Sequence, residues 1–105
     1  MKKRVPWVSH DEEKIKRFRK DPEFALGYLN TCIEVAFEEN DPELILTAIA
    51  SVAKAFGMTQ VALGAALKRE SLHRMLSRRG NPRWDSLFRV LQTLHLRLKF
   101  ERLPA

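Results

Sequence analysis

The sequence has a single cysteine, Cys32, among its 105 residues, so no intrachain disulfide can form. This cysteine lacks the neighbouring Cys and His residues of a zinc site, and its place on an apolar helical stripe predicts a small core residue. No apolar run approaches the ~18 residues that cross a membrane. The basic N-terminus has no apolar stretch typical of a signal peptide. These absences predict a cytoplasmic protein with no metal site and no membrane partner.

The sequence also lacks the patterns of an active site. It has no paired carboxylates, no metal-ligand spacing and no glycine-rich loop that would hold a phosphate. His73 has only Glu70 nearby, three residues earlier on the same predicted helix, so an exposed histidine is favoured over a general acid or base. We therefore expect a protein that is not an enzyme and needs no cofactor.

Charge is divided along the chain, although the net charge is only +6. Residues 1–20 carry eight bases and three acids, residues 21–57 one base and seven acids, and residues 58–105 ten bases and three acids. Blocks of opposite sign indicate two surfaces with different partners, although solvated helix faces would also explain them.

Acidic residues and prolines mark the helix starts of a predicted all-α fold. Asp21-Pro22-Glu23 and Asp41-Pro42-Glu43 repeat one signal, in which Asp caps free amides, Pro fits the first turn and Glu favours the positive end of the dipole. Ser9 with Glu12 forms a capping box. We expect one domain of five or six helices, at 10–20, 22–38, 42–56, 60–66, 69–78 and 83–94.

This domain divides into a basic N-terminal extension (1–20), an acidic helical pair (21–57), a motif with its supporting helix (58–95) and a short strand (96–103). The apolar stripes of the acidic pair extend to Phe37 and Phe56, and we expect both in the core. Gly57 follows as a left-handed cap.

The sequence Leu96-Arg97-Leu98-Lys99-Phe100 alternates apolar and basic residues, as β-strands do. A lone strand leaves its backbone unpaired, so we expect it to pair with the same strand of a second copy. The alternative is a frayed tail whose leucines dock on helix 83–94.

The segment 58–98 predicts a short helix, a tight turn, a second short helix and a supporting helix, which is how a helix-turn-helix offers a basic helix to the DNA major groove. Leu72, Met75 and Leu76 share the inner face of the second helix. Arginine can grip guanine with two parallel bonds, so the predicted base-reading residues are Arg69, Glu70, His73 and Arg74. The predicted phosphate contacts are Gln60, Lys68, Ser77, Arg78, Arg79 and Arg83.

The stretch 21–98 resembles the addiction-module antidote proteins, HigA-type antitoxins with a Cro/lambda-repressor-like helix-turn-helix. The residues that carry the resemblance are Asp41-Pro42-Glu43-Leu44-Ile45, Ala55-Phe56-Gly57-Met58-Thr59-Gln60, Leu67-Lys68-Arg69-Glu70-Ser71-Leu72, Gly80-Asn81-Pro82 and Leu94-His95-Leu96-Arg97-Leu98. The resemblance covers about three quarters of the chain and implies a lambda-repressor-like domain.

The resemblance also implies a function. Such antitoxins neutralise a small RelE/HigB-like or ParE-like toxin, and they bind operator DNA as homodimers and repress their own operon. Half-sites then lie about one turn, ~34 Å, apart. Because such toxins are basic, we expect the acidic cluster to bind the toxin, through Glu34, Glu38, Glu39, Asp41 and Glu43. The alternative is a stand-alone Cro/repressor-like transcriptional regulator without a toxin.

Three positions depart from the family's pattern. Ala66 replaces the usual glycine of the motif turn, at a cost of ~1–2 kcal/mol if the residue is left-handed, unless the turn is rebuilt around Gly64. Lys68 replaces a serine that would cap the second motif helix. His95 replaces a glycine before the final strand.

Overall fold

The computed structural model describes residues 11–104, and this part of the chain contains six helices. They are α1 (Asp11–Lys20), α2 (Pro22–Glu38), α3 (Glu43–Phe56), α4 (Met58–Gly64), α5 (Arg69–Met75) and α6 (Trp84–Thr93). The predicted all-α class is therefore confirmed. The proposed capping box at Ser9 and the predicted helix start at residue 10 lie outside the described residues. The second motif helix ends at Met75 rather than at residue 78, because Leu76 already serves as its C-terminal cap.

The two Asp-Pro-Glu signals start their helices differently. Asp21 caps α2 as predicted, since its Oδ1 accepts a hydrogen bond of 3.1 Å from the Phe24 amide and Pro22 is the first helical residue. In the second copy, Pro42 takes the capping position and α3 begins at Glu43. Asp41 lies before this cap, and its carboxylate accepts a hydrogen bond from Arg78, 37 residues away. The contact with Arg78 thus engages the Asp41 side chain, which the Asp-Pro-Glu pattern alone would make the helix cap.

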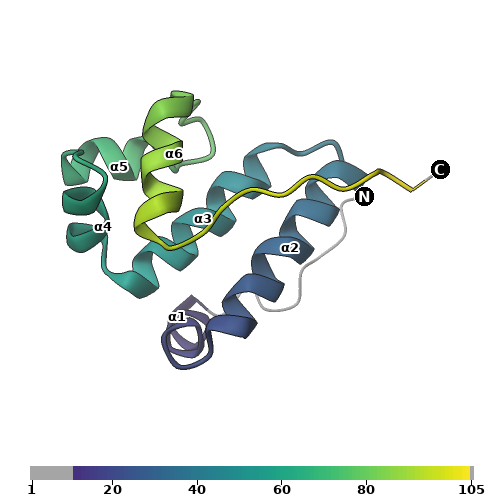
Figure 1. Ribbon diagram of the computed structural model, residues 1–105, viewed down its shortest axis with the longest axis horizontal. Coiled ribbons are helices and arrows are strands. Elements are labelled where there is room, and N and C mark those ends of the chain that lie inside the picture. Colours follow the sequence, from purple (N-terminus) through teal and green to yellow (C-terminus); the bar gives the residue numbers. More distant parts are fainter. Residues whose placement is uncertain (1–10, 105) are drawn as a thin grey trace.

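Helices α2 and α3 lie side by side, α1 packs across the end of the pair where α2 begins and α3 ends, and α4, α5 and α6 gather on the side of α3 away from α2 (Figure 1). The core runs through both groups, and its fully buried members include Cys32, Val61, Leu72 and Val90. The predicted core position of Cys32 is confirmed. The two ends of the predicted apolar stripes are not in the core, because Phe37 is 61% exposed and Phe56 is 49% exposed. Helical periodicity places them on an apolar stripe, but the neighbouring helices do not extend over them.

A sharp bend at Gly57 turns the chain from α3 into α4, with an angle of 102° between the two helices. Gly57 has φ 108° and ψ 114°, so the predicted positive-φ residue after α3 is confirmed. No single helix among the described residues is long and apolar enough to cross a membrane; α3 and α4 pass that test only as a bent pair.

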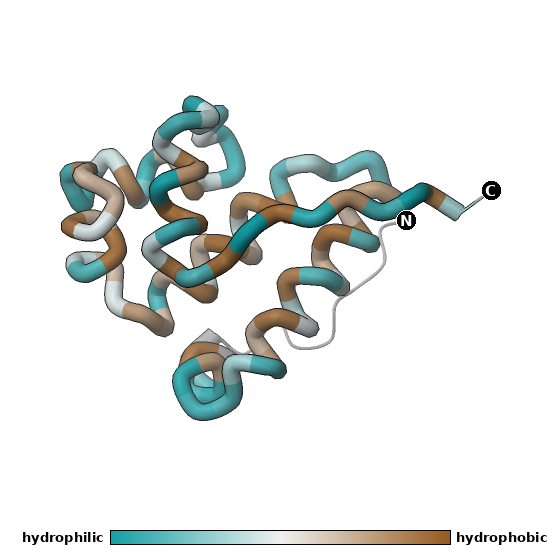
Figure 2. The backbone as a smooth tube through the Cα atoms, in the orientation of Figure 1, coloured by the Kyte–Doolittle hydropathy of each residue, from teal (hydrophilic) through white to brown (hydrophobic). Residues whose placement is uncertain are grey.

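The C-terminal segment leaves α6 at His95, which has φ 61°, and runs as an extended thread (Figure 1). Its alternation of apolar and polar residues is visible along the tube in Figure 2. The Leu96 amide donates to the Leu91 carbonyl at 2.8 Å, and Leu96 packs half-buried against the core. The described chain contains no strand, so the predicted strand at 96–103 is not formed there, since a strand requires a partner to hydrogen-bond. Only Leu96 docks; Leu98 is 55% exposed.

Candidate nucleic-acid interface

Small side chains let α4 approach its neighbours closely. Val61, Ala62 and Ala65 are buried, as the sequence predicts. Gly64 lies against α6, where an added Cβ would come within 2.6 Å of Thr93 Cγ2. The turn that follows is not rebuilt around Gly64, because Gly64 is the last residue of α4. Ala66 itself adopts the left-handed conformation, with φ 56°.

An arginine from the supporting helix braces this turn. Arg89 Nε donates a hydrogen bond of 2.8 Å to the Ala65 carbonyl, and Arg89 Nη1 lies 3.8 Å from Asp85 Oδ2 one turn earlier on α6. The Ala65 carbonyl lies at the C-terminal end of α4, where carbonyls lack helical partners. Arg89 therefore holds the turn that sets the direction of α5. No sequence motif predicted this role for Arg89, and its spacing of four residues from Asp85 was the only local signal.

Helix α5 buries one face and exposes the other. Leu72, Met75 and Leu76 are at most 8% exposed and fix the helix on the core. All the side chains predicted for the outer arc are exposed: Lys68, Arg69, Glu70, His73, Arg74, Ser77, Arg78 and Arg79. The predicted division between the two faces is confirmed, and the result is a basic helix face on a fixed support.

The start of α5 is linked to the start of α4. Arg69 Nη1 donates to Thr59 Oγ1 at 3.3 Å across the turn. Gly57 is the N-terminal cap of α4, which starts at Met58, so the Thr59 hydroxyl is free to accept from Arg69. Gln60 is exposed, and its side-chain oxygen folds back over Gly57.

The cations of this region differ in whether a carboxylate already holds them. Arg78 Nη2 lies 3.4 Å from Asp41 Oδ1 and 3.2 Å from Glu43 Oε1 at the start of α3. Arg83 Nε lies 3.2 Å from Asp85 Oδ1, and the hydrogen bond from Arg83 lowers the pKa of the Asp85 carboxyl. Within the described range, the remaining cations of the motif make no ion pair: Lys68, Arg69, Arg74 and Arg79. These four present charge without first breaking an ion pair.

The loop after α5 holds the end of that helix tightly. Ser77 Oγ donates to the Arg74 carbonyl at 2.7 Å, so Ser77 acts in capping α5. Gly80 packs so closely on the Met75 carbonyl that an added Cβ would overlap it. Asn81 follows with φ 43°. In the Gly80-Asn81-Pro82 sequence, Gly80 therefore allows the close approach to the backbone of α5, and Asn81 takes the left-handed conformation that follows.

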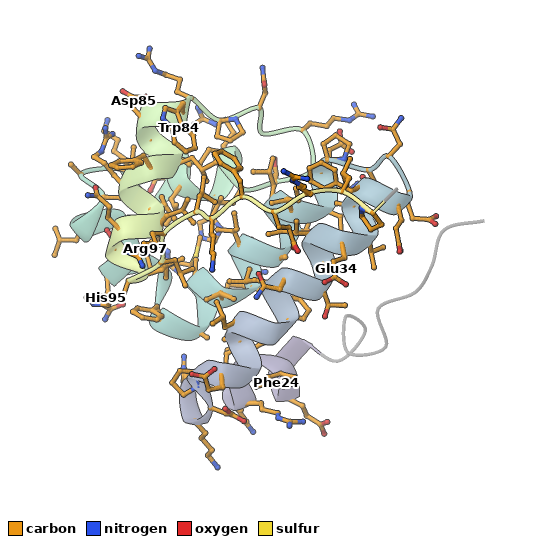
Figure 3. All side chains as sticks on the ribbon, turned by 45° about the vertical axis from the view of Figure 1, so that its right-hand side comes forward. Phe24, Glu34, Trp84, Asp85, His95 and Arg97 are labelled. Atoms are coloured by element: carbon orange, nitrogen blue, oxygen red, sulfur yellow. The ribbon has the colours of Figure 1, made fainter. Side chains whose placement is uncertain are left out.

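The acidic residues lie on α2 and around the turn into α3, where Asp41 and Glu43 meet Arg78. Glu34 and Glu38 are exposed one turn apart on α2, and Glu34 lies well away from Asp85 on α6 (Figure 3). Glu39 and Glu43 are half-buried. Asp41 is only 7% exposed. The structure thus brings four of the five predicted toxin-binding residues to the surface and keeps Asp41 inside.

Trp84 is placed unexpectedly. An aromatic side chain in the first turn of such a supporting helix more often packs in the core, but Trp84 is 58% exposed (Figure 3). Its ring pairs with Phe88 one turn later, with centroids 5.8 Å apart. Leu87 and Val90 face the core from α6 instead. The helical periodicity of α6 therefore places Trp84 on the outward face of the helix.

Comparison with known proteins places this chain among related sequences. A family described as "Probable addiction module antidote protein" matches residues 13–102. An uncharacterized protein from Haemophilus influenzae is 35% identical over 75 residues, which is 71% of this chain and 73% of that protein. No solved structure matches the chain. Within residues 11–104, no group of three or more His, Cys, Asp or Glu side chains is placed to hold a metal ion.

Proposed function

Since the chain belongs to the family of probable addiction module antidote proteins, we propose that it is an antitoxin that binds operator DNA as a dimer, represses its own operon and neutralises a partner toxin. Membership of the family implies a toxin partner of some kind. The observation that carries the DNA-binding part is the outer face of α5, where unpaired cations stand on a helix anchored by Leu72, Met75 and Leu76. This arrangement fits a helix-turn-helix in which α5 enters the major groove.

Two arginines are the principal base readers in this proposal. Arg69 is the first residue of α5, and Arg74 lies on the same exposed face. Side chains in the first turn of an inserted helix point at base edges, and a guanidinium can donate two bonds to guanine O6 and N7. Glu70 and His73 flank them as secondary contacts. The weak bond from Arg69 to Thr59 holds the guanidinium near the N-terminus of α5 until DNA replaces it.

The proposed phosphate contacts fall into two groups. Lys68 and Arg79 bind phosphate directly, because neither has an ion-pair partner in the described part of the chain. Arg78 and Arg83 already pair with carboxylates, so DNA must compete for them, and they contribute less. Gln60 is a neutral donor at the edge of the same surface, whereas the Ser77 hydroxyl must leave the Arg74 carbonyl before it can donate to a phosphate.

Electrophoretic mobility shifts and fluorescence anisotropy test this proposal, with the duplex upstream of the chain's own coding region and a scrambled duplex of equal composition. We expect Arg69→Ala and Arg74→Ala each to cost ~1–3 kcal/mol on the cognate duplex and to relax preference at one base pair. Arg79→Ala should weaken both duplexes alike and reduce the salt slope by ~1. Lys54→Ala, which removes an exposed charge from α3, is the control. Cognate binding that survives loss of both Arg69 and Arg74 would exclude this docking.

For the toxin we propose a contact through the exposed acids of α2 and its C-terminal cap: Glu34, Glu38 and Glu39, with Glu43 at the edge. Asp41 is left out of this contact because it is buried against Arg78. A basic RelE/HigB-like or ParE-like toxin would complement this charge. Reversal of Glu34, Glu38 and Glu39 to Lys should weaken binding of the co-expressed product of the adjoining gene while operator affinity stays at least as high. Unchanged toxin affinity would count against the acidic surface.

The second candidate function is a stand-alone transcriptional regulator without a toxin. The same α5 surface supports it, because operator binding does not require a toxin. Co-purification of the chain with the product of a neighbouring gene for a small basic protein separates the two functions. A chain that binds its operator but captures no such protein would be a regulator alone.

A further inference from the structure

The segment that follows α6 has an apolar face that nothing in the described chain covers. Leu96 packs against the core, but Leu98 is 55% exposed and Phe100 is 94% exposed. Among residues 11–104, no backbone hydrogen bond joins residues 97–104 to another part of the protein. An extended segment with unpaired amides and carbonyls is a template for pairing with another strand.

We propose that residues 96–103 pair antiparallel with the same segment of a second copy of the chain, with Phe100 facing its own counterpart on the twofold axis. The inference rests on the proposed function, in which two copies bind one operator, and it adds the surface that joins them. Residues equally distant from Phe100 on its two sides then face each other across the pair.

Side-chain alternation narrows the possible registers. Directly opposed residues of an antiparallel pair lie on the same face of the sheet, so a slip of one residue would set Phe100 against Lys99 or Glu101. Only registers centred on a residue keep apolar side chains together on one face. Those centred on Leu98, Lys99 and Phe100 satisfy this condition and pair most of the segment.

The charged residues that face each other across the pair distinguish these three registers. Centred on Leu98, the pair sets Arg97 against Lys99 twice; centred on Lys99, it sets Arg97 against Glu101 twice but also sets Lys99 against itself on the axis. Centred on Phe100, it sets Lys99 against Glu101 twice with no like charges opposed, and it places Leu98 across from Arg102. Opposite charges directly across strands stabilise a pair and like charges destabilise it. The Phe100 register is therefore the one we infer.

The same charges explain why the partner is a second copy. Glu101 is the only acid after Asp85, and it lies with Lys99 symmetrically about Phe100. A twofold pairing thus neutralises both residues at once. An isolated two-stranded ribbon is marginal in water, but here the core anchors each strand through Leu96, and the segment crosses in front of α3 in both views (Figures 1 and 3).

Sedimentation velocity of the full chain, without DNA, tests the proposal. We expect a dimer, and we expect Phe100→Asp to raise its dissociation constant at least about thirtyfold. The matched control is Leu103→Asn, which changes a residue 71% exposed on the opposite face of the segment without adding a charge across from Arg97 and should leave the constant within about threefold. The melting temperature should be the same in both variants, because neither side chain is in the core.

Charge exchange tests the register. Lys99→Glu sets two acids face to face and should weaken the dimer, and adding Glu101→Lys should restore it. In a register centred on Lys99 the double variant would instead set a lysine against Arg97 and would not recover. Phe100→Cys should form an interchain disulfide on the twofold axis, and Cys32 does not compete because it is fully buried.

A chain that stays monomeric at every accessible concentration would overturn the proposal, as would a dimer that Phe100→Asp leaves intact. It would also be overturned if the chain alone were monomeric and Phe100→Asp abolished toxin capture instead, because the segment would then serve another partner. Dimerisation through this segment with no operator binding would refute the proposed function and leave this inference standing.

Discussion

Replacing each of two adjacent alanines in the turn between α4 and α5 by glycine should change the free energy of unfolding in opposite directions. Ala66 has φ 56° and is exposed, whereas Ala65 has φ −91° and is completely buried. A non-glycine residue in the left-handed region costs ~1–2 kcal/mol, and glycine adds ~0.4–1 kcal/mol of unfolded-state entropy. Ala66→Gly should therefore raise the free energy of unfolding by ~0.5–1 kcal/mol.

Ala65→Gly should do the reverse. It gives no relief of strain, adds ~0.5–1 kcal/mol of backbone entropy and removes a buried methyl group worth ~0.8 kcal/mol. We expect a loss of ~1–2 kcal/mol. In a domain of this size a change of 1 kcal/mol moves the melting temperature by about 4–8 °C.

Urea and thermal unfolding followed by circular dichroism measure both effects. We expect the melting temperature to rise by about 2–8 °C for Ala66→Gly and to fall by about 4–16 °C for Ala65→Gly. A decrease in both variants would show that Ala66 is not left-handed in solution. The account of the turn, and of the direction it gives α5, would then be wrong.

Two further substitutions test contacts on which the fold depends. Arg78→Met leaves the buried carboxylate of Asp41 without its arginine and should cost ~1–3 kcal/mol of unfolding free energy, whereas Arg79→Met should change it by less than ~0.5 kcal/mol; equal urea midpoints would contradict the pairing. Asp21→Ala removes the cap of α2 and should cost ~1 kcal/mol, while Asp21→Asn should keep most of the stability; a loss as large with Asn would point to charge instead of capping.

The sequence determined the local structure of this protein well. Six helices, the cap at Asp21 and the division of α5 into an apolar and a basic face were predictable, because helix starts and helical periodicity depend on residues within a few positions of one another. The positive φ of Gly57 after α3 followed from the same local rules.

The tertiary structure decided which side chains of those elements are engaged. Arg78 reaches Asp41 across 37 residues, and Arg89 reaches the Ala65 carbonyl across 24. Neither partner is visible in local spacing, so Arg89 was missed and Arg78 was grouped with the free cations.

The tertiary structure also decided whether apolar side chains at the ends of the helices are buried. Phe37 and Phe56 are exposed although both were expected in the core, because periodicity gives the face of a helix but not the length of the neighbour that covers it. The segment 96–103 shows the same limit: alternation predicts a strand, but a strand forms only where another chain segment supplies its hydrogen bonds.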